Sequence, residues 1–138
     1  MYQYDTKVRI RYSETDQMGY VYYGNYAAFY EIGRVEALRD LGTTYKSLED
    51  IGIMMPVLEV NAKYYKPALY DDLITIRTII KELPRARIIF EHQLFNEKDT
   101  LLHEAKTTLT FIKKENHRPC RPPQSIFDAL ERFFQTEK

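Results

Sequence analysis

What is scarce in this 138-residue sequence narrows its class before any motif is considered. Cys120 is the only cysteine, which excludes an internal disulfide and fits a reducing compartment. Basic and acidic residues number 20 each, so no excess charge favours nucleic acid or an anionic membrane. No uncharged apolar run approaches the roughly 20 residues that span a bilayer, and the first residues are charged from Asp5. We therefore expect a cytoplasmic protein with no signal peptide and no membrane insertion.

Several kinds of recognisable chemistry are also missing from the sequence. No set of histidine, cysteine and acidic residues has the spacing of metal ligands, and no serine lies in a nucleophile elbow. A glycine-rich phosphate loop is absent too. His92 and His103 lie in strand-like segments, where packing or surface positions are expected, and His117 lies in a proline-rich segment. We expect neither a metal nor a separate cofactor.

The clearest pattern runs from a strand through a polar loop into a long helix. Residues 7–12 alternate, with Val8, Ile10 and Tyr12 on one face, which predicts a half-buried strand. Residues 24–41 repeat at helical spacing, after the candidate N-cap Asn25 and before a glycine. The inner stripe of this helix consists of Tyr26, Phe29, Tyr30, Gly33, Ala37 and Leu41. We expect the helix to cover one face of a sheet.

Alternation with a period of two dominates the rest of the chain. After a short helix expected near residues 44–51, this alternation predicts strands at 58–64, 74–80, 88–94 and 101–113. Short connections between consecutive strands predict an antiparallel sheet, and hence one α+β domain over residues 1–138. A last helix is expected from Ser125, with a capping box through Asp128. One long helix leaves sheet edges open, so we expect a homo-oligomer.

Asp16 is the residue that the local pattern marks most clearly for chemistry. A loop aspartate is usually a turn former, but this one stands between a strand and the aromatic-rich start of the long helix. Aromatic walls remove water from a carboxylate and make it more basic, which suits a general base or a nucleophile. Backbone N–H groups around residues 22–25 are suited to stabilise an oxyanion.

These residues resemble a known family, the hotdog-fold acyl-CoA thioesterases. The resemblance is to the branch of 4-hydroxybenzoyl-CoA thioesterase and the tol-pal-associated thioesterases. It rests on Tyr12-Ser13-Glu14-Thr15-Asp16, Gly19, Val21-Tyr22, Asn25-Tyr26, Arg34 and residues 64–68 and 70–76. It ends near residues 121–123 and so covers nearly the whole chain. It implies a long central helix wrapped by a curved antiparallel sheet of about five strands, with two subunits joined edge to edge.

The resemblance also implies roles for single residues. Asp16 would act on the thioester carbonyl as nucleophile or by activating water, and the backbone N–H of Tyr23 would polarise that carbonyl. One branch of the family carries histidine where Tyr23 stands, so only the backbone donor is implied here. Basic side chains would meet the phosphates of coenzyme A, and the acyl group would lie at the subunit interface. The substrate-binding residues implied are Gly24, Tyr26, Met55, Pro56, Lys66, Arg85 and Arg87.

The sequence leaves alternatives open within this reading. The leading hypothesis is hydrolysis of an acyl-CoA, in which coenzyme A is part of the substrate and not a cofactor. Hydrolysis of acyl carrier protein thioesters would need a basic docking surface. A non-catalytic acyl-CoA-binding protein would have little reason to retain Asp16. The acyl group, the choice between nucleophile and general base, and the choice between a dimer and a homotetramer all stay open.

Overall fold

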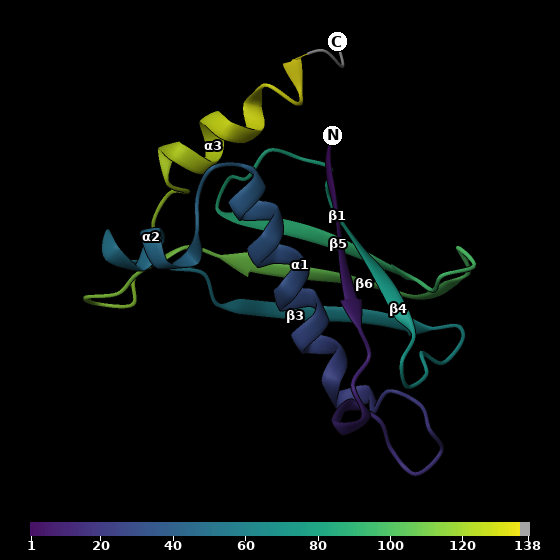
Figure 1. The fold of residues 1–138 in the computed structure, drawn as a ribbon. Helices are drawn as coiled ribbons and strands as arrows, with labels where there is room; N and C mark the ends of the chain where they lie inside the picture. The colour runs from purple at the N-terminus through teal and green to yellow at the C-terminus, as the bar shows by residue number, and fades with distance from the viewer. Residues whose placement is uncertain (136–138) are drawn as a thin grey trace.

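A five-stranded antiparallel sheet with a long helix packed across it forms the centre of the molecule (Figure 1). The computed structural model describes residues 1–135. The strands of the sheet are β1 (Tyr2–Arg9), β3 (Val57–Tyr64), β4 (Leu73–Ile80), β5 (Arg87–Phe95) and β6 (Leu101–Thr110), in the spatial order β1-β4-β5-β6-β3. The remaining elements are α1 (Tyr26–Asp40), α2 (Tyr45–Asp50), α3 (Gln124–Glu131) and the paired short strands β2 (Ile53–Met54) and β7 (Ile112–Lys113). The expected α+β class is confirmed.

β1 lies earlier in the chain than the alternation of residues 7–12 predicts. It pairs with β4 along its whole length, and the chain leaves the sheet after Ile10. There Ile10 N–H donates to Asp72 O (2.9 Å), and Asp71 N–H donates to Ile10 O (3.0 Å). A short 3₁₀ helix follows and contains Tyr12. Tyr12 is therefore exposed, although the alternation placed it on the same strand face as Val8 and Ile10. The strand stops early because a turn distant in sequence takes over its hydrogen bonds.

α1 packs on the sheet through the face that its helical spacing predicts. The predicted inner stripe is buried along its whole length, and Arg34 and Leu38 are buried beside it. Gly33 allows the helix to lie close to β4. A Cβ added there would come within 3.0 Å of Ile76 Cγ2 and still closer to Thr78 Oγ1. The missing side chain therefore sets the distance between helix and sheet.

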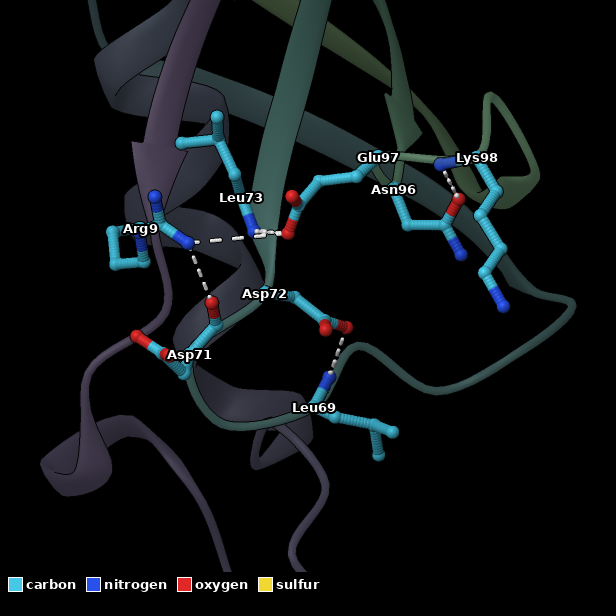
Figure 2. A network of polar contacts seen from close by, with 8 residues as sticks. All are labelled: Arg9, Leu69, Asp71, Asp72, Leu73, Asn96, Glu97 and Lys98. Atoms are coloured by element: carbon cyan, nitrogen blue, oxygen red, sulfur yellow. Dashed lines mark hydrogen bonds and ion pairs between the residues drawn. The ribbon is translucent and has the colours of Figure 1, made fainter.

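The segment between β3 and β4 is not the turn between neighbouring strands that its shortness suggests. β3 is an edge strand and β4 lies next to the opposite edge, so this crossover passes across the end of the sheet. Figure 2 shows how its far end is held: Arg9 Nη1 donates to Asp71 O (2.9 Å), and Leu69 N–H donates to Asp72 Oδ2 (2.9 Å). Glu97, in the turn after β5, joins the same network 3.9 Å from Arg9. The network fixes where the crossover enters β4.

The apolar run of residues 101–113 forms two strands and not the single one expected. β6 ends at Thr110, and the next two-residue strand, β7, belongs to a different sheet. Phe111 marks the break, because its side chain is fully buried and its carbonyl accepts from Cys120 N–H (2.9 Å). The segment around Cys120 thereby takes over the hydrogen bonding at Phe111, and β6 ends there.

α3 covers the end of the core away from the Asp16 loop, and its apolar side packs on that core. Ile126 and Leu130 are fully buried in the cluster that also contains the C-terminal half of α1. The capping box expected between Ser125 and Asp128 does not form. Instead, the Gln124 side chain donates to Asp128 Oδ1 (2.7 Å).

β3 forms where alternation predicts a strand, but it is exposed along its whole length. All of its residues are exposed, including Leu58 at 52% and Val60 at 49%. α1 packs chiefly on β1 and β4, at the other side of the sheet, and leaves β3 uncovered. β3 therefore offers an open edge and an uncovered apolar face.

Candidate active site

Asp16 lies in a tight loop that its own carboxylate helps to shape. Asp16 Oδ1 accepts from Met18 N–H (2.8 Å) and Tyr20 N–H (3.4 Å). Asp16 N–H donates to Tyr20 O (2.8 Å), and Gly19 follows with φ +79°, a left-handed conformation that favours glycine. The Asp16 side chain is half-buried and is not enclosed. Its second oxygen, Oδ2, has no hydrogen-bond partner within residues 1–135, so it is available to a ligand.

The start of α1 is fixed against the same loop. Tyr22 N–H and the Asn25 side chain both donate to Glu14 O, at 2.9 and 2.8 Å. Asn25 thus precedes the helix as predicted, but its side chain does not cap it. The N–H groups of Tyr23 and Gly24 come before the first hydrogen bond inside the helical turn and have no acceptor in the described part of the chain. They are free donors at the positive end of α1.

The crossover between β3 and β4 supports both the loop and the helix start. Val21 N–H donates to Ala68 O (2.8 Å), and Tyr20 forms an isolated bridge with Leu69. The Tyr26 side chain, in the first turn of α1, also lies beside the backbone of Ala68. The carboxylate, the free N–H groups and the crossover therefore form one corner of the molecule.

The residues predicted to bind substrate fall into two groups at opposite ends of the sheet. The group near the predicted catalytic residues Asp16 and Tyr23 consists of Gly24, Tyr26 and Lys66. The group at the far end consists of Met55, Pro56, Arg85 and Arg87. Lys66 N–H donates to Leu102 O, whereas Pro56 O accepts from Thr110 N–H. Along β6 these two points are roughly 26 Å apart at about 3.3 Å per residue, so one chain does not bring the groups together.

Comparison with known proteins assigns this arrangement to a family. Residues 10–130 match the Thioesterase-like superfamily. The chain belongs to that superfamily. The acyl-CoA thioester hydrolase YbgC of Escherichia coli O157:H7 is 33% identical over 119 residues, covering 86% of this chain and 89% of that protein. The acyl-CoA thioesterase YbgC of Haemophilus influenzae is 30% identical over 124 residues, covering 89% and 90%.

A solved structure is similar to this Thioesterase-like chain over almost its full length. It is a DHNA-CoA thioesterase from Staphylococcus aureus, with a TM-score of 0.90 and 32% identity, covering 99% of this chain and 92% of that one. Together with the relatives, it confirms the expected family, the hotdog fold and the class of enzyme, a thioester hydrolase. The roles of Asp16 and of the Tyr23 N–H stay predictions.

The thioesterase domain places His103 beside this corner, which the sequence did not reveal. Its ring stacks on Tyr26 with centroids 4.2 Å apart, and Tyr64 contacts it edge-on at 4.6 Å. The hydroxyl of Tyr30 bonds to His103 Nε2. Burial lowers the pKa of His103 to about 4, so the ring is neutral at pH 7. The strand pattern placed this histidine among apolar neighbours, but only the fold shows its partners from α1.

His92, on the neighbouring strand, is the second buried histidine. Its Nδ1 lies 3.4 Å from Thr78 Oγ1, and its Nε2 lies 3.3 Å from Thr107 Oγ1. Burial, and then the charge of Arg34, lower its pKa to about 3. Both ring nitrogens have a partner, so His92 reads as a packed core residue, as expected.

The described part of the chain contains no cluster of side chains suited to bind a metal ion. Within residues 1–135, no group of three or more histidine, cysteine, aspartate and glutamate side chains is placed to hold a metal ion. That the protein needs neither a metal nor a separate cofactor stays a prediction.

Proposed function

We propose that this protein is an acyl-CoA thioesterase, which hydrolyses an acyl-CoA to the free acid and coenzyme A. The observation that carries the proposal is the corner that holds both the Asp16 loop and the start of α1, in a member of the Thioesterase-like superfamily. Asp16 Oδ2 supplies a carboxylate oxygen that has no partner in the part of the chain that the structure describes, and the N–H groups of Tyr23 and Gly24 supply donors. Attack on a thioester needs both parts.

The two parts have separate tasks in the reaction. The carbonyl oxygen of the thioester binds the Tyr23 N–H, and the negative charge that develops on this oxygen is stabilised by the positive end of α1. Asp16 either takes a proton from the attacking water or attacks the carbonyl carbon itself. In the second case an acyl anhydride forms and water cleaves it. In both cases the carbon–sulfur bond breaks and coenzyme A leaves as its thiol.

We also propose that a second subunit completes the site. Antiparallel pairing of β3 with the same strand of another copy, about a two-fold axis, joins the open edges into one continuous sheet. The start of one β3 then lies beside the end of the other. This pairing places the partner's Pro56 next to Tyr64, and it brings the partner's Arg85 and Arg87 to the end of the sheet that holds Asp16. The two separated groups of residues thus meet across the interface.

The purified protein is expected to be a dimer, or a dimer of dimers, at micromolar concentration. Val60→Lys would bring like charges together at the centre of the β3 pair and should release monomers with little activity, since each site is then incomplete. Sedimentation velocity with a parallel thiol-release assay measures both effects. Gln3→Lys, an exposed change on the other edge strand, is the matched control. A monomeric wild-type protein would rule out the shared site.

Coenzyme A has a natural position near Arg85. A surface cleft of about 610 Å³ is lined by Arg85, Arg121 and Phe127. Guanidinium groups bind phosphates well, and an aromatic ring gives a nucleotide base a face to stack on. We propose that Arg85 and Arg87 contact the phosphates of coenzyme A, and that Lys66 contacts the part of the substrate nearer Asp16.

Replacing Arg85 and Arg87 by alanine is expected to raise KM for acyl-CoA and to leave kcat almost unchanged. Phosphate contacts far from the carbonyl bind substrate and transition state equally. Each exposed contact is worth about 1 kcal/mol, or about fivefold in KM. Lys46→Ala with Lys98→Ala removes the same charge from other exposed positions and serves as the control. A KM that stays the same at low salt would show that the arginines are only solvated.

A panel of acyl-CoAs, from short aliphatic to aromatic, tests the proposed function through release of free thiol. At least one should be hydrolysed with turnover. If the protein hydrolyses acyl carrier protein thioesters but no acyl-CoA, its substrate is the acyl carrier protein thioester. Tight acyl-CoA binding without thiol release would overturn catalysis in favour of a binding protein.

We further propose that the protein acts in the cytoplasm. Within residues 1–135, no helix combines the length and apolar character needed to cross a membrane. Its single cysteine, Cys120, is unpaired. An unpaired cysteine fits a reducing compartment such as the cytoplasm.

A further inference from the structure

The side chain of Asn25 does not cap the helix that it precedes. A residue that caps an N-terminus usually has extended backbone angles, and its side-chain oxygen accepts from an N–H group of the first turn. Asn25 has φ −86° and ψ −11°, which are already helical angles, and its side chain makes no such bond. Instead, its Nδ2 donates to Glu14 O (2.8 Å), just before the Asp16 loop. The asparagine at this position therefore has a role other than capping.

The carbonyl of Glu14 joins the two parts of the proposed reaction centre. It accepts from Tyr22 N–H (2.9 Å) as well as from the side chain of Asn25 (2.8 Å). We call these two bonds the Glu14 clamp. Tyr22 and Asn25 stand on either side of the two residues whose N–H groups are the proposed donors to the thioester carbonyl. The clamp therefore holds the donor segment at both of its ends.

Glu14 is itself held in place, so the clamp is fixed relative to Asp16. Its carboxylate is buried and accepts from Arg11 N–H (2.7 Å), and its own N–H donates to Arg11 O (3.0 Å). Thr15, which separates Glu14 from Asp16, is extended with φ −103° and ψ 158° and forms an isolated bridge with Val21. The chain between the clamp and Asp16 is therefore short, extended and bonded, with little freedom to bend.

We propose that Asn25 is a positioning residue, which sets the distance between the Asp16 carboxylate and the N–H donors at the start of α1 through the Glu14 clamp. This proposal rests on the proposed thioesterase function. Asn25 acts without touching the substrate, because its amide is bonded to the backbone of Glu14. A thioester must reach the carboxylate and the donors at the same time. A displacement of about 1 Å in such a site lowers the rate by about a hundredfold.

Asn25→Ala is expected to lower kcat for thiol release by about tenfold to a hundredfold and to leave KM almost unchanged. Alanine suits the helical backbone angles of this position, so the fold should remain. Asn25→Asp keeps the shape of the side chain without an N–H donor and should lose kcat as well. Asn116→Ala is the control, since it removes a side-chain bond to Arg118 N–H (2.9 Å) outside the corner. A wild-type kcat in Asn25→Ala would overturn the proposal.

A combination with Asp16→Ala separates positioning from general support of the fold. Once the carboxylate is gone, its distance from the donors no longer matters. Adding Asn25→Ala to Asp16→Ala should therefore change the residual kcat by no more than about twofold, whereas the same change in the wild-type protein costs far more. A residue that only supports the fold would lower kcat by the same factor in both backgrounds. Equal factors would overturn the positioning role.

Amide hydrogen exchange tests the Glu14 clamp without any assay of activity. In Asn25→Ala the segment of residues 20–26 should exchange faster than in the wild-type protein, because the clamp has lost one of its two bonds. The exchange of α3 should stay the same and provides the internal reference. Unchanged exchange in residues 20–26 would overturn the clamp. Faster exchange in a protein that hydrolyses no thioester would overturn the thioesterase function, and with it the catalytic role of Asn25, but not the clamp itself.

Discussion

Asp16→Ala is expected to lower kcat by about 10²–10⁴-fold, the range for loss of a general base, with little change in KM. Asp16 Oδ2 has no hydrogen-bond partner among residues 1–135 and lies in the corner that holds the N–H donors at the start of α1. Residual turnover would come from those donors and from substrate positioning. Loss of the bonds from Met18 and Tyr20 to Oδ1 should cost only about 1 kcal/mol of stability each.

Two further substitutions separate the chemistry of Asp16 from its place in the loop. Asp16→Asn keeps an oxygen for Met18 N–H but removes the charge, so it should lose kcat with almost no loss of stability. Mass spectrometry must confirm that it has not deamidated. Asp72→Ala is the matched control, because Asp72 also holds a loop through Leu69 N–H but lies outside the reaction centre. If Asp16→Ala keeps its turnover and loses melting temperature as Asp72→Ala does, Asp16 is only a turn former.

Mild acid is expected to destabilise the fold strongly, because His92 and His103 are buried and neutral. Burial lowers their pKa values to about 3 and about 4, below the unfolded value near 6.5. Below pH 6.5 the unfolded chain binds protons that the folded chain does not. Stability therefore falls as pH falls, by up to about 1.4 kcal/mol per pH unit for each histidine. Between pH 6.5 and 4.5 the two together amount to about 4 kcal/mol, a large part of the stability of a small domain.

Urea unfolding at a series of pH values measures this slope directly. His92→Gln should remove about half of the slope between pH 6.5 and 4.5, since one of the two protonation sites is gone. His117, which is exposed in the folded chain, provides the control substitution His117→Gln. A free energy of unfolding that stays constant over this range would show that the histidines are accessible to protons in the folded protein.

The sequence predicts those parts of the fold that depend on local periodicity. The inner stripe of α1 follows from helical spacing, and the structure buries all of it, including Gly33 where the helix approaches β4. Strand ends are a different matter. β1 stops because Asp71 and Asp72, far along the chain, take over the hydrogen bonds of Ile10. Alternation alone contains no information about such a partner.

The same distinction applies to the candidate site. Asp16, Tyr23 and Gly24 are close in sequence, so the pattern of loop and helix start already predicts that they lie in one corner, and their roles stay predictions. The contacts of His103 with Tyr26 and Tyr30 join β6 to α1 and arise only from tertiary packing. Arg85 lies at the other end of the sheet from Asp16, and no pattern within one chain says whether a second copy brings the two together.

The strand order also determines when the reaction centre can form as the chain folds. β1 pairs with β4, with Tyr2 opposite Ile80, and the Asp16 loop is anchored on Ala68. Contacts between such distant positions form slowly, because the intervening chain must first lose conformational freedom. During synthesis, Asp16 and α1 leave the ribosome well before the crossover and β4 that support them. A nascent chain that has not yet reached Ile80 therefore carries Asp16 without the corner on which its proposed function depends.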